Sequence, residues 1–519
     1  MKKKCNSLQA NADFPQQSGP KSSLQCDTYN SDAEKSLTNS LNENIAALKK
    51  LLPIDTSFDL VHRDLFLGET PAYWLGINGF CKTEILQQIF SDLQNPLYVQ
   101  NGEIEDIVRY MSGKIGYAQV TLTSSLPEIL QNVLSGPSVL LIDGFHRAIL
   151  IDVRTYPTRS IAEPDAEKIT KGARDGFVET LLFNTNLIRR RIRSPRLTFA
   201  IHRVGTESQT DVAVAYLNHS VNEELLATLT ATIRQLDITS LTMGTKSLEE
   251  LLVKKKWWSP LPNIRLTERP DVACSYLLEG HIIIIVDNSP SVMILPCTIF
   301  QFLQSPEDYY KSPVVGTYFR LVRFLCIPVN LLLMPLFLLI TAYLPGISSE
   351  LHLLSEGSPA AARIFFYVVT VEVFLDLFKY SASLSSSRFA GALSIVSGLI
   401  IGDIAVSLQW ASTEVLFYAA ITLLASLAIS SIEFADGIRV YRMLMVLATG
   451  VAGIYGFFGS LVLVCLSITI TPTFGGMSYF WPLFPFNWSA LKSLLFRYPT
   501  AKAQPCKVWD RGRVHKNNS

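Results

Sequence analysis

The spacing of hydrophobic residues divides the chain into three parts. Residues 1–35 are mainly Ser, Asn, Gln, Asp and Lys, and such a stretch buries too little apolar surface to offset the entropy lost on ordering. Residues 36–310 alternate segments of helical periodicity with short apolar runs that are typical of strands. Long apolar runs then follow one another through residues 320–470. The pattern predicts a disordered polar tail, a soluble α/β part and an all-α multi-pass transmembrane bundle.

The soluble part contains two similar segments. "GPSVLLIDGFHRAILIDV" begins at Gly136, and "GHIIIIVDNSPSVMILP" begins at Gly280. Each is a glycine, an apolar strand that ends in aspartate, a short turn and a second apolar strand, and a Pro-acidic element follows. We therefore predict two related subdomains, residues 36–200 and 201–310, each built around a hairpin. Convergence on a common hairpin is the alternative explanation.

Four apolar runs are candidates for membrane spans: residues 324–344, 389–408, 415–432 and 443–470. Small residues in two of them predict close helix packing, and these are Gly398 and Gly402, which form a GxxxG, and Gly456. The distribution of Lys and Arg predicts a cytoplasmic N-terminal part. The pattern leaves open whether residues 364–380 also cross, and therefore on which side the amphipathic segment and basic tail at 471–519 lie.

The stretch "VTVEVFLDLFKY" carries Glu372, Asp376 and Lys379 among apolar residues. Their spacing places all three on one face of a helix. A charge facing lipid at the bilayer centre costs at least ~2.5–3.5 kcal/mol, so this face must meet water, headgroups or protein. Three interpretations remain: an aqueous ion pathway, an interfacial helix, or a structural ion pair inside the bundle. Asp403, in the separate Gly-rich run "GLIIGDIAVSL", is a further acidic candidate for an ion pathway.

Composition narrows the class of protein. Apolar residues make up 49% and charged residues 17% of the 519 residues, and the mean hydropathy of +0.27 is high for a soluble protein. The net charge of +1 provides no basic field for nucleic acid. The eight cysteines lie far apart without metal-ligand spacing. With no P-loop and no nucleophile elbow, we expect no enzyme, no cofactor and no metal site.

The basic run "IRRRIR" at residues 188–193 has helical periodicity. Because no catalytic residues accompany it, the helix would be solvated, face lipid headgroups or face another subunit. We expect Arg189 and Arg191 to contact neighbouring subunits.

Several stretches resemble signature blocks of the GerA-type spore germination A subunits. They are "GFVETLLFNTNLIRRRIRSPRL", "TDVAVAYL", "SPLPNIRLTERPDVACSYLLEG", "VDNSPSVMILP" and "QSPEDYY", and they stand in the family's order between residues 58 and 499. The end "FWPLFPFNWSALKSLLFRYP" is closer to the stage V sporulation AF branch than to germinant-receptor A subunits. The long polar start and the block "TSLTMGTKSLEELL" depart from the usual pattern.

The resemblance implies an integral protein of the spore inner membrane with its large N-terminal domain on the core side. It implies a homo-oligomer, in the form of a ring, that conducts monovalent cations during germination together with other spore membrane proteins, including a small membrane partner. The alternatives are a non-conducting scaffold or sensor subunit and a germinant-receptor A subunit.

Overall fold

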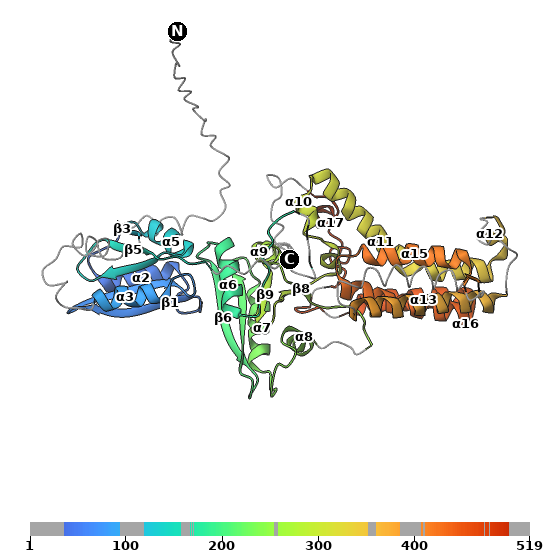
Figure 1. The fold of residues 1–519 in the computed structure, drawn as a ribbon, viewed down its shortest axis with the longest axis horizontal. Coiled ribbons are helices and arrows are strands. Elements are labelled where there is room, and N and C mark those ends of the chain that lie inside the picture. Colours follow the sequence, from blue (N-terminus) through green and yellow to red (C-terminus); the bar gives the residue numbers. More distant parts are fainter. Residues whose placement is uncertain are drawn as a thin grey trace, which may run out of the picture.

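A computed structural model describes residues 36–93, 119–156, 167, 169, 171–253, 258–350, 360–384, 406–407, 411–471, 473–476 and 478–497. Two sheet-containing subdomains and a group of long helices follow one another along an elongated molecule (Figure 1). The first subdomain consists of α2 (Leu41–Leu51), β1 (Leu60–Leu67), β2 (Thr70–Ile77), α3 (Thr83–Leu93), β3 (Gln119–Thr123), α5 (Leu126–Ser135), β4 (Ser138–Ile142) and β5 (Ala148–Asp152).

The second subdomain repeats this topology. It consists of α6 (Leu181–Arg191), β6 (Leu197–Val204), β7 (Thr210–Leu217), α7 (Glu223–Arg234), α8 (Thr245–Leu252), β8 (Arg265–Thr267), α9 (Pro270–Leu278), β9 (Ile282–Val286) and β10 (Val292–Leu295). The sheet orders are β1-β2-β4-β5-β3 and β6-β7-β9-β10-β8, and every pair of neighbouring strands is antiparallel. Strand for strand, the two orders are the same.

Polar contacts at the start of each subdomain follow the same repeat. The Asn44 amide bonds both backbone groups of Thr38 (2.9 and 2.7 Å), and the Asn184 amide does the same to Val178 (2.8 and 2.5 Å). The aspartate that ends each central strand, Asp143 or Asp287, accepts from the first N–H of α2 or α6. The two aspartates satisfy a backbone N–H that a helix start leaves unpaired, and the two asparagines bind the chain just before each helix.

The predicted boundary at residue 200 is wrong, because it cuts strand β6. The second subdomain begins with α6, the equivalent of α2, and the boundary lies between β5 and α6. The Arg-rich helix was assigned to the first subdomain because it follows that subdomain's hairpin. Its hydrophobic residues instead pack on β6, β7 and β9 of the second sheet.

The described residues after β10 contain these helices: η2 (Ile299–Leu303), α10 (Glu307–Tyr310), α11 (Pro313–Tyr343), α12 (Pro345–Glu350), α13 (Ala361–Leu384), α15 (Thr413–Leu427), α16 (Ile432–Ile470) and α17 (Trp488–Leu495). Within the described part, α11 and α16 are long and apolar enough to cross a membrane, and α15 is a shorter apolar helix.

Helix α16 reverses direction at Gly453, where φ is +57° and the backbone is not helical. The hydroxyl groups of Tyr441 and Ser467 are 2.6 Å apart across this reversal. A straight helix would separate these residues by about 39 Å at 1.5 Å per residue. The prediction of a single span over residues 443–470 is therefore wrong, because two antiparallel arms meet at Gly453. Glycine adopts the positive φ of this position more readily than other residues.

The segment after α16 returns to the soluble part. Phe474 belongs to the core cluster of the second sheet. The Tyr479 hydroxyl donates to the carbonyl oxygen of Pro262 (2.9 Å), and the backbone N–H of Ile299 donates to the Tyr479 carbonyl (3.0 Å). Residues 473–497 therefore lie at the same end of the helices as the soluble subdomains, which the sequence pattern left open.

Candidate functional site

The charged face of α13 lies against the beginning of α16. Glu372, Asp376 and Lys379 form ion pairs with Arg442, Arg439 and Asp436, respectively. The order of the partners is reversed because the two helices run antiparallel. We call these three ion pairs the charge ladder. Its residues are spaced by three or four positions on both helices, so each helix contributes one face.

The innermost pair of the charge ladder is enclosed by protein. Glu372 is 1% exposed and Arg442 is 3% exposed. Their atoms Oε2 and Nη2 are 2.8 Å apart, and Arg442 Nη1 also donates to the backbone and side-chain oxygens of Asn330 on α11. Glu372 Oε1, Arg442 Nε and Asn330 Nδ2 have no hydrogen-bond partner among the described residues. The network is therefore buried but incompletely satisfied.

The outer two pairs are more open. The side chains of Asp376 and Asp436 are 45% and 50% exposed, whereas Arg439 is only 13% exposed. The carboxylates of Asp376 and Asp436 thus form the accessible edge of the charge ladder, whereas the guanidinium group of Arg439 lies on its inner side.

Only one register of α13 against α16 pairs all three charges. A shift that placed Asp376 opposite Arg442 would bring Lys379 toward Arg439. The opposite shift would bring Asp376 toward Asp436. Like charges placed opposite each other are destabilising, so the charge ladder fixes the relative position of the two helices.

The other predicted site residues have different places. Asp403, Gly398 and Gly402 lie outside the described residues. Gly456 lies in the second arm of α16, where a Cβ atom would collide with the carbonyl oxygen of Ala448 in the first arm. The absence of a side chain at Gly456 therefore permits the two arms to approach closely.

Arg189 does not fit its predicted role as a subunit contact, because it is fully buried inside one chain. Its Nε donates to Asp59 Oδ2 of the first subdomain (2.7 Å), and its other nitrogens donate to the carbonyl oxygens of Ser194 and Leu197. It therefore joins the two subdomains. Arg191 is 24% exposed and pairs with Asp175 at 2.6 Å, so part of its surface is open to a neighbour.

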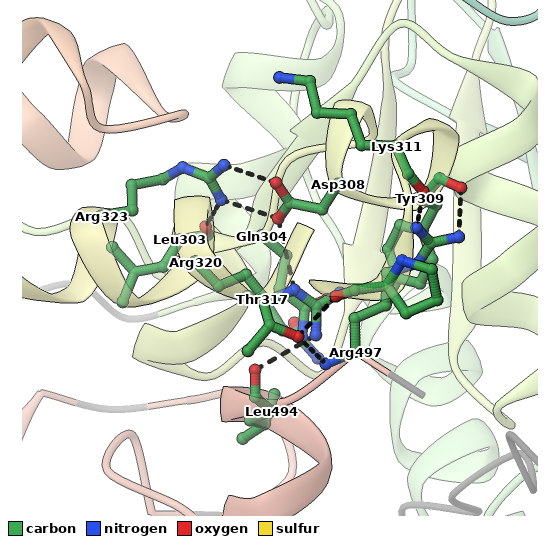
Figure 2. Close-up of polar contacts among 12 residues, drawn as sticks. Leu303, Gln304, Asp308, Tyr309, Lys311, Thr317, Arg320, Arg323, Leu494 and Arg497 are labelled. Atoms are coloured by element: carbon green, nitrogen blue, oxygen red, sulfur yellow. Dashed lines mark hydrogen bonds and ion pairs between the residues drawn. The ribbon is translucent and has the colours of Figure 1, made fainter. Parts of the chain in front are cut away.

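The structure adds a site that sequence reasoning missed, at the connection between the soluble part and α11 (Figure 2). Asp308 of α10 is 0% exposed. Arg323 donates to both of its carboxylate oxygens (2.7 and 3.0 Å), and Arg320 Nε donates at 3.3 Å. Such bidentate, charge-assisted pairs are among the stronger hydrogen bonds in proteins. We call Asp308, Arg320 and Arg323 the junction cluster.

The junction cluster ties three segments together. Arg323 also donates to the carbonyl oxygen of Leu303 in η2, and Arg320 to that of Leu494 in α17. A Cβ atom at Gly316 would lie 2.6 Å from the carbonyl oxygen of Asp308, so α11 rests directly on the α10 backbone. In the sequence, the signal was an aspartate in "SPEDYY" followed by two arginines one helical turn apart. These contacts join α11 to the segment that directly follows the second subdomain.

A pocket of about 240 Å³ adjoins the junction cluster between α9 and residues 304–310, and its lining includes Arg265, Tyr276, Glu279 and Tyr309. Burial raises the pKa of Glu279 to about 7, although the nearby guanidinium groups of Arg265 and Arg320 oppose this shift. Burial lowers the pKa of the neighbouring His281 to about 4. These two groups give the second subdomain opposing responses to pH.

Glu279→Gln is expected to remove a pH-dependent loss of stability. The raised pKa makes the folded chain hold a proton that the unfolded chain releases, so the contribution of Glu279 to stability falls as pH rises from about 4.5 to about 7. The contribution of His281 to stability falls instead as pH decreases below about 6.5. It is the same in the parent and in Glu279→Gln, so it cancels from the difference between them. Glu279→Gln should therefore gain ~2–3 kcal/mol relative to the parent between pH 4.5 and pH 8. Chemical unfolding at these two pH values measures this difference, and the exposed Glu207→Gln is the control. An equal difference at both pH values would contradict the prediction.

The chain matches known proteins over most of its length. Residues 46–506 match the family described as Bacillus/Clostridium GerA spore germination protein. Stage V sporulation protein AF of Bacillus subtilis (strain 168) is 31% identical over 91% of this chain and 96% of its own length. Spore germination protein KA of the same organism is 29% identical over 89% of this chain and 85% of its own length.

The chain is also similar to a solved structure. It is the N-terminal domain of the A subunit of the Bacillus megaterium spore germinant receptor GerK3, with 25% identity, a TM-score of 0.39, and coverage of 50% of this chain and 96% of that domain. The family match and the relative that is 31% identical both extend over nine-tenths of the chain or nearly so. This chain belongs to the GerA family of spore germination proteins.

Proposed function

We propose that this chain is the membrane subunit of an oligomeric cation channel that acts in bacterial spore germination and amplifies ion release. Its place would be the spore inner membrane, with the two sheet subdomains on the core side and the helices forming a multi-pass bundle. Copies of the chain would assemble as a ring, together with other spore germination proteins, including a small membrane partner. The relatives' names, which are those of spore germination and sporulation proteins, support the biological setting.

The incompletely satisfied charge ladder is the observation that carries the channel proposal. Buried polar atoms in folded proteins almost always have a hydrogen-bond partner, which is protein or water. Glu372 Oε1, Arg442 Nε and Asn330 Nδ2 lack one among the described residues, so we expect water to reach them. Ionisable groups within apolar helices face a bundle interior or a water-filled cavity and commonly mark ion pathways.

In this proposal, the predicted pathway residues have two roles. Glu372 is enclosed and bound to Arg442, so its role is to hold α13 against α16. Asp376 and Asp436 are about half exposed and would present carboxylates to a pathway. Rings of acidic side chains attract cations, and Asp403 remains a candidate for the same pathway. In this proposal, Gly398, Gly402 and Gly456 serve helix packing, and Arg191 contacts a neighbouring subunit.

One observation favours a second function, a non-conducting scaffold or sensor subunit. The three carboxylates of the charge ladder are matched by three basic groups within one chain. A purely structural bundle would show the same neutral arrangement.

Conductance distinguishes the two functions. In planar bilayers that contain the reconstituted oligomer, Asp376→Asn combined with Asp436→Asn should shift the reversal potential in a KCl gradient toward that of a non-selective pore. Glu433→Gln removes a carboxylate of similar exposure at the same end of α16 and should leave selectivity unchanged. A parent protein that assembles but passes no current would favour the scaffold. A double variant as cation-selective as the parent would show that the pathway is lined by other residues.

A further inference from the structure

The first turns of α11 have their polar and apolar faces reversed relative to a helix in water. Gly316, Arg320 and Arg323 point inward and are buried at the junction cluster. The opposite face exposes large apolar side chains: Val314 is 79% exposed, Tyr318 61% and Leu325 64%. A helix on the surface of a soluble protein places apolar residues inward. This segment also slants across the direction of the other long helices (Figure 1).

A second exposed apolar group comes from the C-terminal segment. Phe484, Phe486 and Trp488 are 74%, 66% and 61% exposed, respectively. Two contacts hold this segment beside α11: Arg320 donates to the Leu494 carbonyl, and the backbone N–H of Arg497 donates to Thr317 Oγ1 (Figure 2). Two chain segments far apart in sequence therefore expose aromatic side chains at the same end of the helices.

Basic side chains accompany these aromatic groups. Lys311 lies two residues before α11, and its ammonium group pairs with Glu307 at 3.1 Å and lies 4.2 Å from the centre of the Phe319 ring. Lys492 is exposed on α17. The Arg497 guanidinium is partly exposed and donates to the backbone carbonyl oxygens of Tyr309 and Lys311. An apolar face with Trp and Tyr beside Lys and Arg is typical of a helix that lies in a membrane interface.

We propose that this face, which we call the collar, lies in the headgroup region of the bilayer and binds anionic phospholipid. The collar consists of Val314, Tyr318, Phe484, Phe486, Trp488, Lys311, Lys492 and Arg497. Continuity identifies the bilayer as the occupant, because α11 runs directly from the collar into its apolar part. At 1.5 Å per residue, the 31 residues of α11 extend about 46 Å, whereas a bilayer's hydrocarbon core is about 30 Å thick. The first turns therefore have the length to lie at headgroup level, where lysine and arginine meet lipid phosphates.

Photo-crosslinking of the full-length protein tests the proposal. The protein is reconstituted in nanodiscs that contain either photoactivatable phosphatidylglycerol or photoactivatable phosphatidylcholine, and adducts are mapped by mass spectrometry. We expect adducts on residues 314–325 and 483–488 with both lipids, and more of them with phosphatidylglycerol. Lys492→Gln should lower the phosphatidylglycerol yield at 483–488 by about fivefold, the effect of one basic group at an anionic surface. Lys49→Gln, which removes an exposed lysine of the first subdomain, should change nothing.

Three outcomes would overturn the proposal. Adducts confined to α16 and absent from the collar would show that another protein surface or water covers this face. Equal yields with the two lipids would remove the anionic preference, as would an unchanged yield in Lys492→Gln. Because the mapping on α16 reports correct reconstitution in the same sample, a negative result at the collar is interpretable.

Discussion

Arg442→Met is expected to destabilise the helical part by about 3–5 kcal/mol, because it leaves the buried Glu372 carboxylate without its cation. The same substitution removes the donor to both oxygens of Asn330. Methionine retains an unbranched apolar stem like that of arginine, so loss of packing by the stem contributes little. Unfolding of the detergent-solubilised protein by a denaturing detergent, followed by circular dichroism, measures the change.

A double variant distinguishes a buried ion pair from a general need for polar groups. Combining Arg442→Met with Glu372→Leu replaces both charges by apolar groups and should recover much of the loss, because buried pairs are often replaceable by well-packed hydrophobic residues. Arg439→Met, whose partner Asp376 is nearly half exposed, should cost less than Arg442→Met. A cost for the double variant equal to the sum of the single costs would mean that Glu372 and Arg442 do not depend on each other.

The charge ladder shows what helical spacing predicts and what it does not. The positions of Glu372, Asp376 and Lys379 correctly predicted one charged face on a helix, since that follows from local periodicity. Their partners lie on a helix that is distant in sequence, and nothing local identifies it. Arg439 and Arg442 were interpreted only as indicators of topology. Their three-residue spacing, continued to Asp436, was a complementary pattern that could have suggested the pairing.

Burial explains the failure at Arg189. A run of basic residues on a helix is ordinarily solvated, so sequence alone favours a surface position. Here Asp59, from the other subdomain, and two carbonyl oxygens supply the partners that a buried guanidinium requires. The two hairpins were recognisable because the same local pattern occurs twice: a glycine, an apolar strand that ends in aspartate, a turn and a second apolar strand. The boundary between the subdomains depends instead on which sheet α6 covers.

The reversal at Gly453 was hidden for a different reason. Apolar composition continues on both sides of it, and glycine is common in membrane helices, so no polar residue marks the turn. The small residue Gly456 predicts close packing of helices, but spacing does not distinguish packing between helices from packing across a turn, and here Gly456 faces Ala448 across the turn.

Asp308→Asn is expected to disconnect the soluble part from α11. Asparagine keeps the shape of aspartate but leaves the guanidinium groups of Arg320 and Arg323, which are almost fully buried, without an anion. Removing one partner of a buried ion pair costs about 3–5 kcal/mol of stability. The loss should also weaken the hydrogen bonds that the same arginines donate to η2 and α17. Hydrogen exchange should rise in α10, the first turns of α11 and α17, while the first subdomain keeps its protection. Asp55→Asn, which removes an exposed acid paired with Lys49, should change stability by no more than ~1 kcal/mol.

If the oligomer conducts ions, Asp308→Asn should alter its opening and leave its ion selectivity intact, since Asp308 lies outside the charge ladder. Unchanged exchange in α11 would show that the backbone contact at Gly316 is sufficient to hold the junction without the ion pairs.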